Sequence, residues 1–126
     1  MEFRSLDIIS QLEKNIQQGY KLPIFSGYVA INKRGVEKFI DMIYANLPMD
    51  VKNAREFLQN RQLEISNKRK SRIYDSLELL ETQIDKAPSF FPTYVIVQIK
   101  EIEKLLDKVR DTLPEEILKA QNVNNQ

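Results

Sequence analysis

Residues 28–54, YVAINKRGVEKFIDMIYANLPMDVKNA, decide the fold, because the chain contains a second, related version of this stretch. That version is residues 94–120, YVIVQIKEIEKLLDKVRDTLPEEILKA, which aligns without a gap at an offset of 66 residues. The identical pairs are Tyr28/Tyr94, Val29/Val95, Glu37/Glu103, Lys38/Lys104, Asp41/Asp107, Leu47/Leu113, Pro48/Pro114 and Ala54/Ala120. What repeats is a set of core positions, a helix and a Leu-Pro corner, so the repeat predicts structure and no catalytic constellation.

The repeat predicts a mostly helical protein with a minor β component (α+β), built from two related helix–short strand–helix–helix halves. We expect residues 1–60 to form the first half, 61–72 a polar and basic bridge, 73–121 the second half and 122–126 a frayed tail. All of these would belong to one compact domain. The halves would pack their apolar helix stripes together and pair their short strands about a pseudo-twofold axis.

The apolar stripes of the two copies supply the predicted core, since their members recur at i, i+3, i+4 and i+7. Two tyrosines at the head of the copies join them as packing residues. The predicted packing residues are Tyr28, Val36, Phe39, Ile40, Ile43, Leu47, Tyr94, Ile102, Leu105, Leu106, Val109 and Leu113.

Each copy begins with β-branched and aromatic residues, which predict a brief strand at 28–31 followed by Asn32 as the N-cap of a helix ending near Asn46. Pro48 predicts a corner between this helix and the next, because proline is tolerated in a first helical turn. The second copy has the same corner at 112–115, where Thr112 and Glu115 fit a capping box.

Two stretches allow alternative interpretations. Residues 93–99 favour a strand by composition and by the repeat, yet their apolar spacing also fits a helix running from Pro92 to Asp111. Residues 50–85 contain no glycine or proline and could form one helix, but their polar middle predicts either a solvated helical bridge or a broken connection.

Ahead of the first copy, Ser5 is the expected N-cap of an amphipathic helix, which Gly19 would end. The connection that follows contains Pro23, which forces an extended backbone, and Gly27, which permits a turn.

The composition excludes several classes of site. The chain has 19 basic and 18 acidic residues, hence a formal charge of +1, so no overall field attracts nucleic acid or an anionic membrane. It has no cysteine and no histidine, which removes thiol chemistry, the usual general base and the commonest transition-metal ligand. The N-terminal stretch is charged throughout and predicts neither a signal peptide nor a membrane span, so the expected location is the cytoplasm.

One basic cluster, residues 67–72, could contact phosphates through Lys68, Arg69, Lys70 and Arg72. No groove-reading motif or interleaved aromatic residue accompanies it, so a solvated surface is the favoured interpretation and nucleic acid is a disfavoured partner.

The pairs Glu37/Asp41 and Glu103/Asp107 place two carboxylates on one helix face, as acid–base or divalent-ion sites require. Lysines lie beside both pairs, and such pairs are common on solvated helices. The three glycines are isolated and form no phosphate-binding loop. We therefore expect no catalytic residue, no metal site and no cofactor, and the chain is not predicted to be an enzyme.

Between Leu22 and Ala54 the sequence resembles a family of small bacterial proteins described as similar to the ATP synthase b subunit or to the DivIVA cell-division scaffold. The matching residues are Leu22-Pro23, Ser26-Gly27, Val29, Ile31, Asn32, Ile40-Asp41, Leu47-Pro48 and Ala54. The resemblance implies coiled-coil association through a long helix after this pattern, where the present chain carries its second copy.

The predicted function is a non-catalytic assembly or adaptor module that binds a protein partner or associates with itself as a homodimer. The alternative is a small nucleic-acid-associated regulator that uses the basic cluster at 67–72.

Overall fold

The computed structural model describes residues 3–66, 70–91 and 93–124. The elements are, in order, α1 (Arg4–Gln17), β1 (Tyr20–Lys21), β2 (Tyr28–Asn32), α2 (Lys33–Asn60), α3 (Ile73–Lys86), β3 (Ser89–Phe91), β4 (Tyr94–Gln98), α4 (Ile99–Asp111) and α5 (Glu115–Asn124). This confirms the mostly helical class with a minor β component, whose strands form a small antiparallel sheet. Of the two alternatives for residues 93–99, the strand is the one that forms, and the helix begins only at Ile99.

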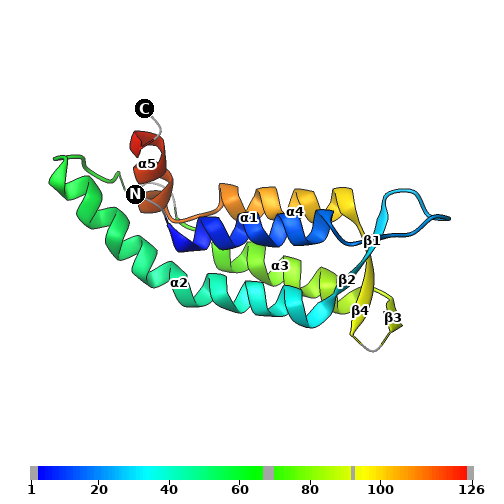
Figure 1. Ribbon diagram of the computed structural model, residues 1–126. Coiled ribbons are helices and arrows are strands. Elements are labelled where there is room, and N and C mark those ends of the chain that lie inside the picture. The colour runs from blue at the N-terminus through cyan, green and yellow to red at the C-terminus, as the bar shows by residue number, and fades with distance from the viewer. Residues whose placement is uncertain (1–2, 67–69, 92, 125–126) are drawn as a thin grey trace.

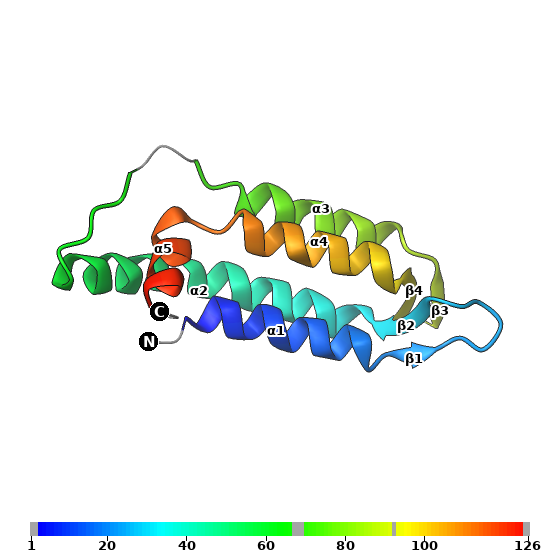
Figure 2. The ribbon, with the colours of Figure 1, turned by 90° about the horizontal axis from the view of Figure 1, so that it is seen from above.

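Helices α1 to α4 lie side by side as a bundle, with the sheet at one end (Figure 1). Contacts join α1 to α2, α2 to α3, α3 to α4 and α4 to α1, and successive helices run in opposite directions. At the end away from the sheet, α2 extends past the other helices and α5 crosses it (Figure 2). The first and last described residues both lie at this end.

The sheet has the order β1-β2-β4-β3, and all its neighbours are antiparallel. The central pair takes one strand from each half of the chain, with Ala30 opposite Ile96. Since side chains alternate along a strand, one face of this pair meets the helices and the other faces away. The side chains on the helix-facing side, all buried, are Val29, Ile31, Val95 and Val97.

Most of the predicted packing residues lie in the helical core. Those that are buried are Val36, Ile40, Ile43, Leu47, Ile102, Leu106, Val109 and Leu113. Phe39 and Leu105 are partly buried against the same core. Tyr28 and Tyr94 are the exceptions: they are 38% and 39% exposed, because their positions in the strands place them on the face that the helices do not cover.

The predicted corner at Leu47 and Pro48 is wrong, because α2 continues through it for 28 residues in all. Proline in a helix interior costs about 3 kcal/mol relative to alanine. Burial of the residues beyond it offsets this cost, since Ala54 and Leu58 are fully buried and α5 packs on this half of α2. Pro48 itself is exposed, so its ring displaces no core side chain.

Ser5 is not the N-cap of the first helix. Helix α1 begins at Arg4, and the N-cap residue Phe3 makes no capping bond through its side chain. Instead, Asp50 of α2 accepts hydrogen bonds from the backbone N–H groups of Arg4, at 3.3 Å, and Ser5, at 2.7 Å. The Ser5 hydroxyl also donates to this carboxylate. A carboxylate from the middle of another helix therefore caps α1.

The stretch 50–85 is broken. Helix α2 ends at Asn60, Gln62 has a positive φ of 57°, and residues 63–66 are not helical. The polar middle of the stretch provides no apolar stripe that would hold a helix against the bundle, and the next helix begins at Ile73. Residues 67–69 lie outside the described residues.

The second Leu-Pro corner is present, but its predicted capping box is not. Thr112 is the C-cap of α4, and its hydroxyl donates to the carbonyl of Lys108 at 2.7 Å. It also lies 2.8 Å from the hydroxyl of Ser76 in α3, which joins two helices of the bundle. Helix α5 then continues through 122–124, which were predicted to fray, because Ile117 and Ala120 anchor it in the core.

Candidate partner-binding groove

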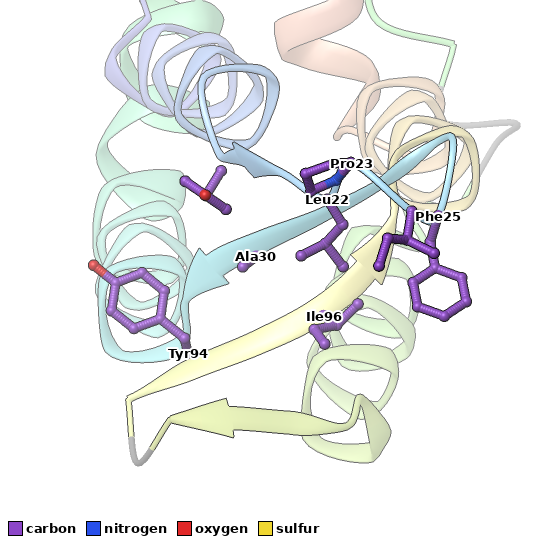
Figure 3. Close-up of a pocket in the computed structure, with 8 residues that line it drawn as sticks. Leu22, Pro23, Phe25, Ala30, Tyr94 and Ile96 are labelled. Atoms are coloured by element: carbon purple, nitrogen blue, oxygen red, sulfur yellow. The ribbon is translucent and has the colours of Figure 1, made fainter.

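The outer face of the sheet carries an apolar groove of about 620 Å³. The described residues that line it are Tyr20, Leu22, Pro23, Ile24, Phe25, Ala30, Tyr94 and Ile96. Phe25 and Tyr94 stand toward opposite ends, with Leu22, Ala30 and Ile96 between them (Figure 3). None of these side chains is charged, although 29% of the residues in the chain are charged.

One wall of the groove is the loop of residues 22–27, which connects β1 to β2. The backbone N–H of Leu22 donates to the carbonyl of Tyr28, and the N–H of Tyr28 donates to the carbonyl of Phe25. Gly27 closes the turn with a φ of +86°, a region that residues with a side chain rarely adopt. The Phe25 ring meets the Tyr28 ring edge-on at 6.3 Å. These contacts give the loop a defined conformation.

The tip of this loop presents its apolar side chains to solvent. Ile24 is 86% exposed and Phe25 is 61% exposed. Isolated apolar residues on a surface need no explanation, whereas a large contiguous apolar patch is a mark of an interaction surface. The tip and the groove together form such a patch.

The acidic pair Glu37/Asp41 faces a second acidic pair, Glu81/Asp85 of α3, across a smaller hollow of about 220 Å³. Lys33 partly neutralises them, because its Nζ lies 3.3 Å from an oxygen of Asp85. Across the described ranges, no group of three or more potential ligands is arranged to hold a metal ion.

The other acidic pair, Glu103/Asp107, lies on α4. Arg110 lies 3.6 Å from the Asp107 carboxylate and 2.7 Å from that of Glu13 in α1. This arrangement joins two helices through ion pairs and is typical of a structural surface contact.

Tyr44 lies beside the acidic hollow and stacks on Tyr74, with ring centroids 5.7 Å apart and planes at 7°. Burial, followed by the charge of Glu81 and a hydrogen bond to it, raises the pKa of Tyr44 to about 12. The phenol therefore stays protonated to a higher pH than an ordinary tyrosine, and it donates a hydrogen bond from α2 to Glu81 of α3.

The basic cluster is described only in part. Lys70 and Arg72 are exposed, whereas Lys68 and Arg69 lie outside the described residues. Nucleic-acid contact through this cluster stays a prediction.

Sequence reasoning missed the groove, although it identified the proline and glycine that shape its loop. The overlooked signal was the pair Ile24-Phe25. These two large apolar residues lie between Pro23 and Gly27, in a stretch that was interpreted only as a connection. The place of Ala30 and Ile96 in the groove was not predictable either, because the composition of a strand does not show which of its faces the helices leave uncovered.

Comparison of the chain with protein-family models, with curated proteins and with solved structures finds no match. The resemblance to proteins similar to the ATP synthase b subunit or DivIVA thus stays a prediction. None of the helices in the described ranges combines the length and the apolar character needed to cross a bilayer. The location in the cytoplasm likewise stays a prediction.

Proposed function

We propose that this chain is a non-catalytic assembly or adaptor module, and that it binds a protein partner through the groove on the outer face of its sheet. The observation that carries the proposal is the uncharged, apolar lining of that groove beside a loop tip whose Ile24 and Phe25 are largely in solvent. A site of this character favours apolar side chains over charged substrates or phosphates.

The proposal includes an internal duplication, which the sheet register supports. Ala30 pairs with Ile96, the residue that the offset of 66 makes its equivalent, and the pairs Tyr28/Gln98 and Asn32/Tyr94 flank it symmetrically. A twofold axis between Ala30 and Ile96 would exchange the two central strands. The element order of helix, short strand, strand and helix also recurs in both halves.

The two halves differ where the groove lies, which suits a specific binding function. Six residues connect β1 to β2, whereas two connect β3 to β4. The longer loop forms one wall of the groove. In this proposal, duplication supplies the scaffold and the longer loop supplies the binding surface.

Site-specific photo-crosslinking tests the proposal. A photoreactive phenylalanine analogue replaces Phe25 in the full chain within cells that produce it, and adducts are identified by mass spectrometry. The matched control carries the analogue at Leu79 of α3, which is 48% exposed and outside the groove. We expect a polypeptide adduct at position 25 and none at position 79. Absence of any polypeptide adduct at position 25 would refute the proposed function.

A further inference from the structure

We propose that the occupant of the groove is a second copy of this chain, with the loop tip of each copy seated in the groove of the other. This inference rests on the function proposed for the groove and adds the identity of the partner. It requires a donor surface, an acceptor surface, a symmetric arrangement of the two and the absence of charge repulsion between them.

The donor surface is the loop tip, Ile24 and Phe25. Burying large apolar side chains stabilises an interface, and these two side chains are 86% and 61% exposed in the isolated chain. The loop is held by Gly27 and by the contact of Phe25 with Tyr28, so seating it costs little conformational entropy.

The acceptor surface is the floor and far wall of the groove. Ala30 and Ile96 lie on the central strands and form the floor, while Tyr20 and Tyr94 flank it. Ala30 is only 5% exposed and lies at the bottom of the groove, between larger lining residues. The groove has a volume of about 620 Å³, which leaves room for large apolar side chains.

The groove is open rather than enclosed. Tyr20 is 69% exposed and Tyr94 is 39% exposed, so the flanking side chains stand in solvent. A small molecule here would keep much of its surface in water, whereas pockets for such molecules bury most of the ligand. A protein surface would cover the loop tip and the flanking tyrosines together.

Donor and acceptor lie next to each other on one face, and this geometry favours a second copy. A twofold axis would place each loop tip opposite the other copy's floor and form the same contact twice. The described lining residues carry no charge, so two identical faces meet without repulsion, and the chain as a whole carries only +1. A charged peptide or nucleic acid would find no partner charge in the groove.

Cysteine crosslinking between two differently labelled copies tests this contact. The native chain contains no cysteine, so full-length Ile24→Cys and Ile96→Cys variants each carry a single thiol. After mild oxidation of an equimolar mixture, we expect the mixed disulfide to exceed that formed between Ile24→Cys and the control Leu79→Cys. Equal yields with the two partners would overturn the proposed contact.

The solution mass provides the second test. Light scattering over a wide concentration range should show a dimer that Ile24→Asp weakens by about tenfold or more, while Leu79→Asp leaves it unchanged. Circular dichroism should be the same for all three proteins, because residue 24 lies almost entirely in solvent. A wild-type chain that stays monomeric throughout refutes the second copy.

The two proposals can fail separately. A monomeric chain with photo-adducts at position 25 to a different polypeptide retains the adaptor function and rules out self-association. If the chain is monomeric and forms no polypeptide adduct, both the adaptor function and self-association are refuted.

Discussion

The Asp50 carboxylate lies 2.7 Å from the backbone nitrogen of Ser5, although 45 residues separate the two in the chain. Both residues are buried, at 3% and 0% exposure. A helix N-terminus has backbone N–H groups without intrahelical partners and the positive end of the helix dipole, so a carboxylate stabilises it. Asp50 belongs to α2, not to the helix that it caps. Only the packing of α1 on α2 brings its carboxylate to the N-terminus of α1.

Replacement of Asp50 by alanine should destabilise the protein by about 2–3 kcal/mol, because it leaves two N–H groups and a buried hydroxyl without their acceptor. Urea unfolding followed by circular dichroism measures the effect. Asp41→Ala on the same helix is the control, since that side chain is exposed and its loss should cost within about 0.5 kcal/mol. Equal stability of the two variants would show that the capping contact contributes nothing.

Pro48→Ala should stabilise the protein by about 1–3 kcal/mol, because Pro48 lies inside α2 and its ring removes a helical N–H donor. The residue is exposed, so alanine creates no cavity. Met49→Ala, at a neighbouring exposed position, should leave the unfolding free energy nearly unchanged. A loss of stability in Pro48→Ala would mean that the fold requires a bend here.

Gly19→Ala should destabilise the protein by about 1–3 kcal/mol. An added Cβ would lie 2.9 Å from Cγ2 of Ile31 and 3.1 Å from the carbonyl oxygen of Ala30, and the strand backbone cannot move away freely. At Gly35 the nearest atom would be 3.8 Å away and the residue is helical, so Gly35→Ala should gain about 0.5–1 kcal/mol. Opposite signs in thermal unfolding are the expected result, and a shared sign contradicts it.

Tyr44 should make stability fall as the pH rises from 10 to about 12. In this interval the unfolded chain releases the Tyr44 proton while the folded chain retains it, so raising the pH favours unfolding. The ultraviolet absorbance of tyrosinate should include a step near pH 12 that belongs to Tyr44.

The Tyr44→Phe variant provides the control for this assignment. It should lose the late step in the absorbance titration and show a weaker fall in stability over the same pH interval. Persistence of the late step in Tyr44→Phe would assign it to another tyrosine.

Local sequence patterns predicted the elements whose signals are local. The strand at Tyr28–Asn32 has β-branched residues after a glycine, and the side chain of Asn32 accepts a hydrogen bond from the N–H of Gly35, as an N-cap should. The same logic failed at Pro48 and Ser5, where the deciding contacts come from other helices. A proline that resembles a helix start becomes an interior residue when the residues after it are buried.

The groove, too, was only partly predictable from the sequence. Pro23 and Gly27 marked a turn, but the groove exists only because the helices cover one face of the sheet and leave Ala30 and Ile96 on the other. Tyr28 and Tyr94 were assigned to packing for the same reason, since a strand alternates its side chains without indicating which face will be covered.

The amino-acid sequence alone determined the helical class, the strand that begins at Tyr28 and the apolar stripes, because hydrophobic periodicity and capping act over a few residues. It also determined the absence of cysteine and histidine, and with it the chemistry that the chain lacks. Tertiary structure alone decided that α2 runs through Pro48, that Asp50 caps α1 and that one face of the sheet stays open. Each of these depends on contacts between segments distant in the chain, and their free energies outweigh local preferences of about 1–3 kcal/mol.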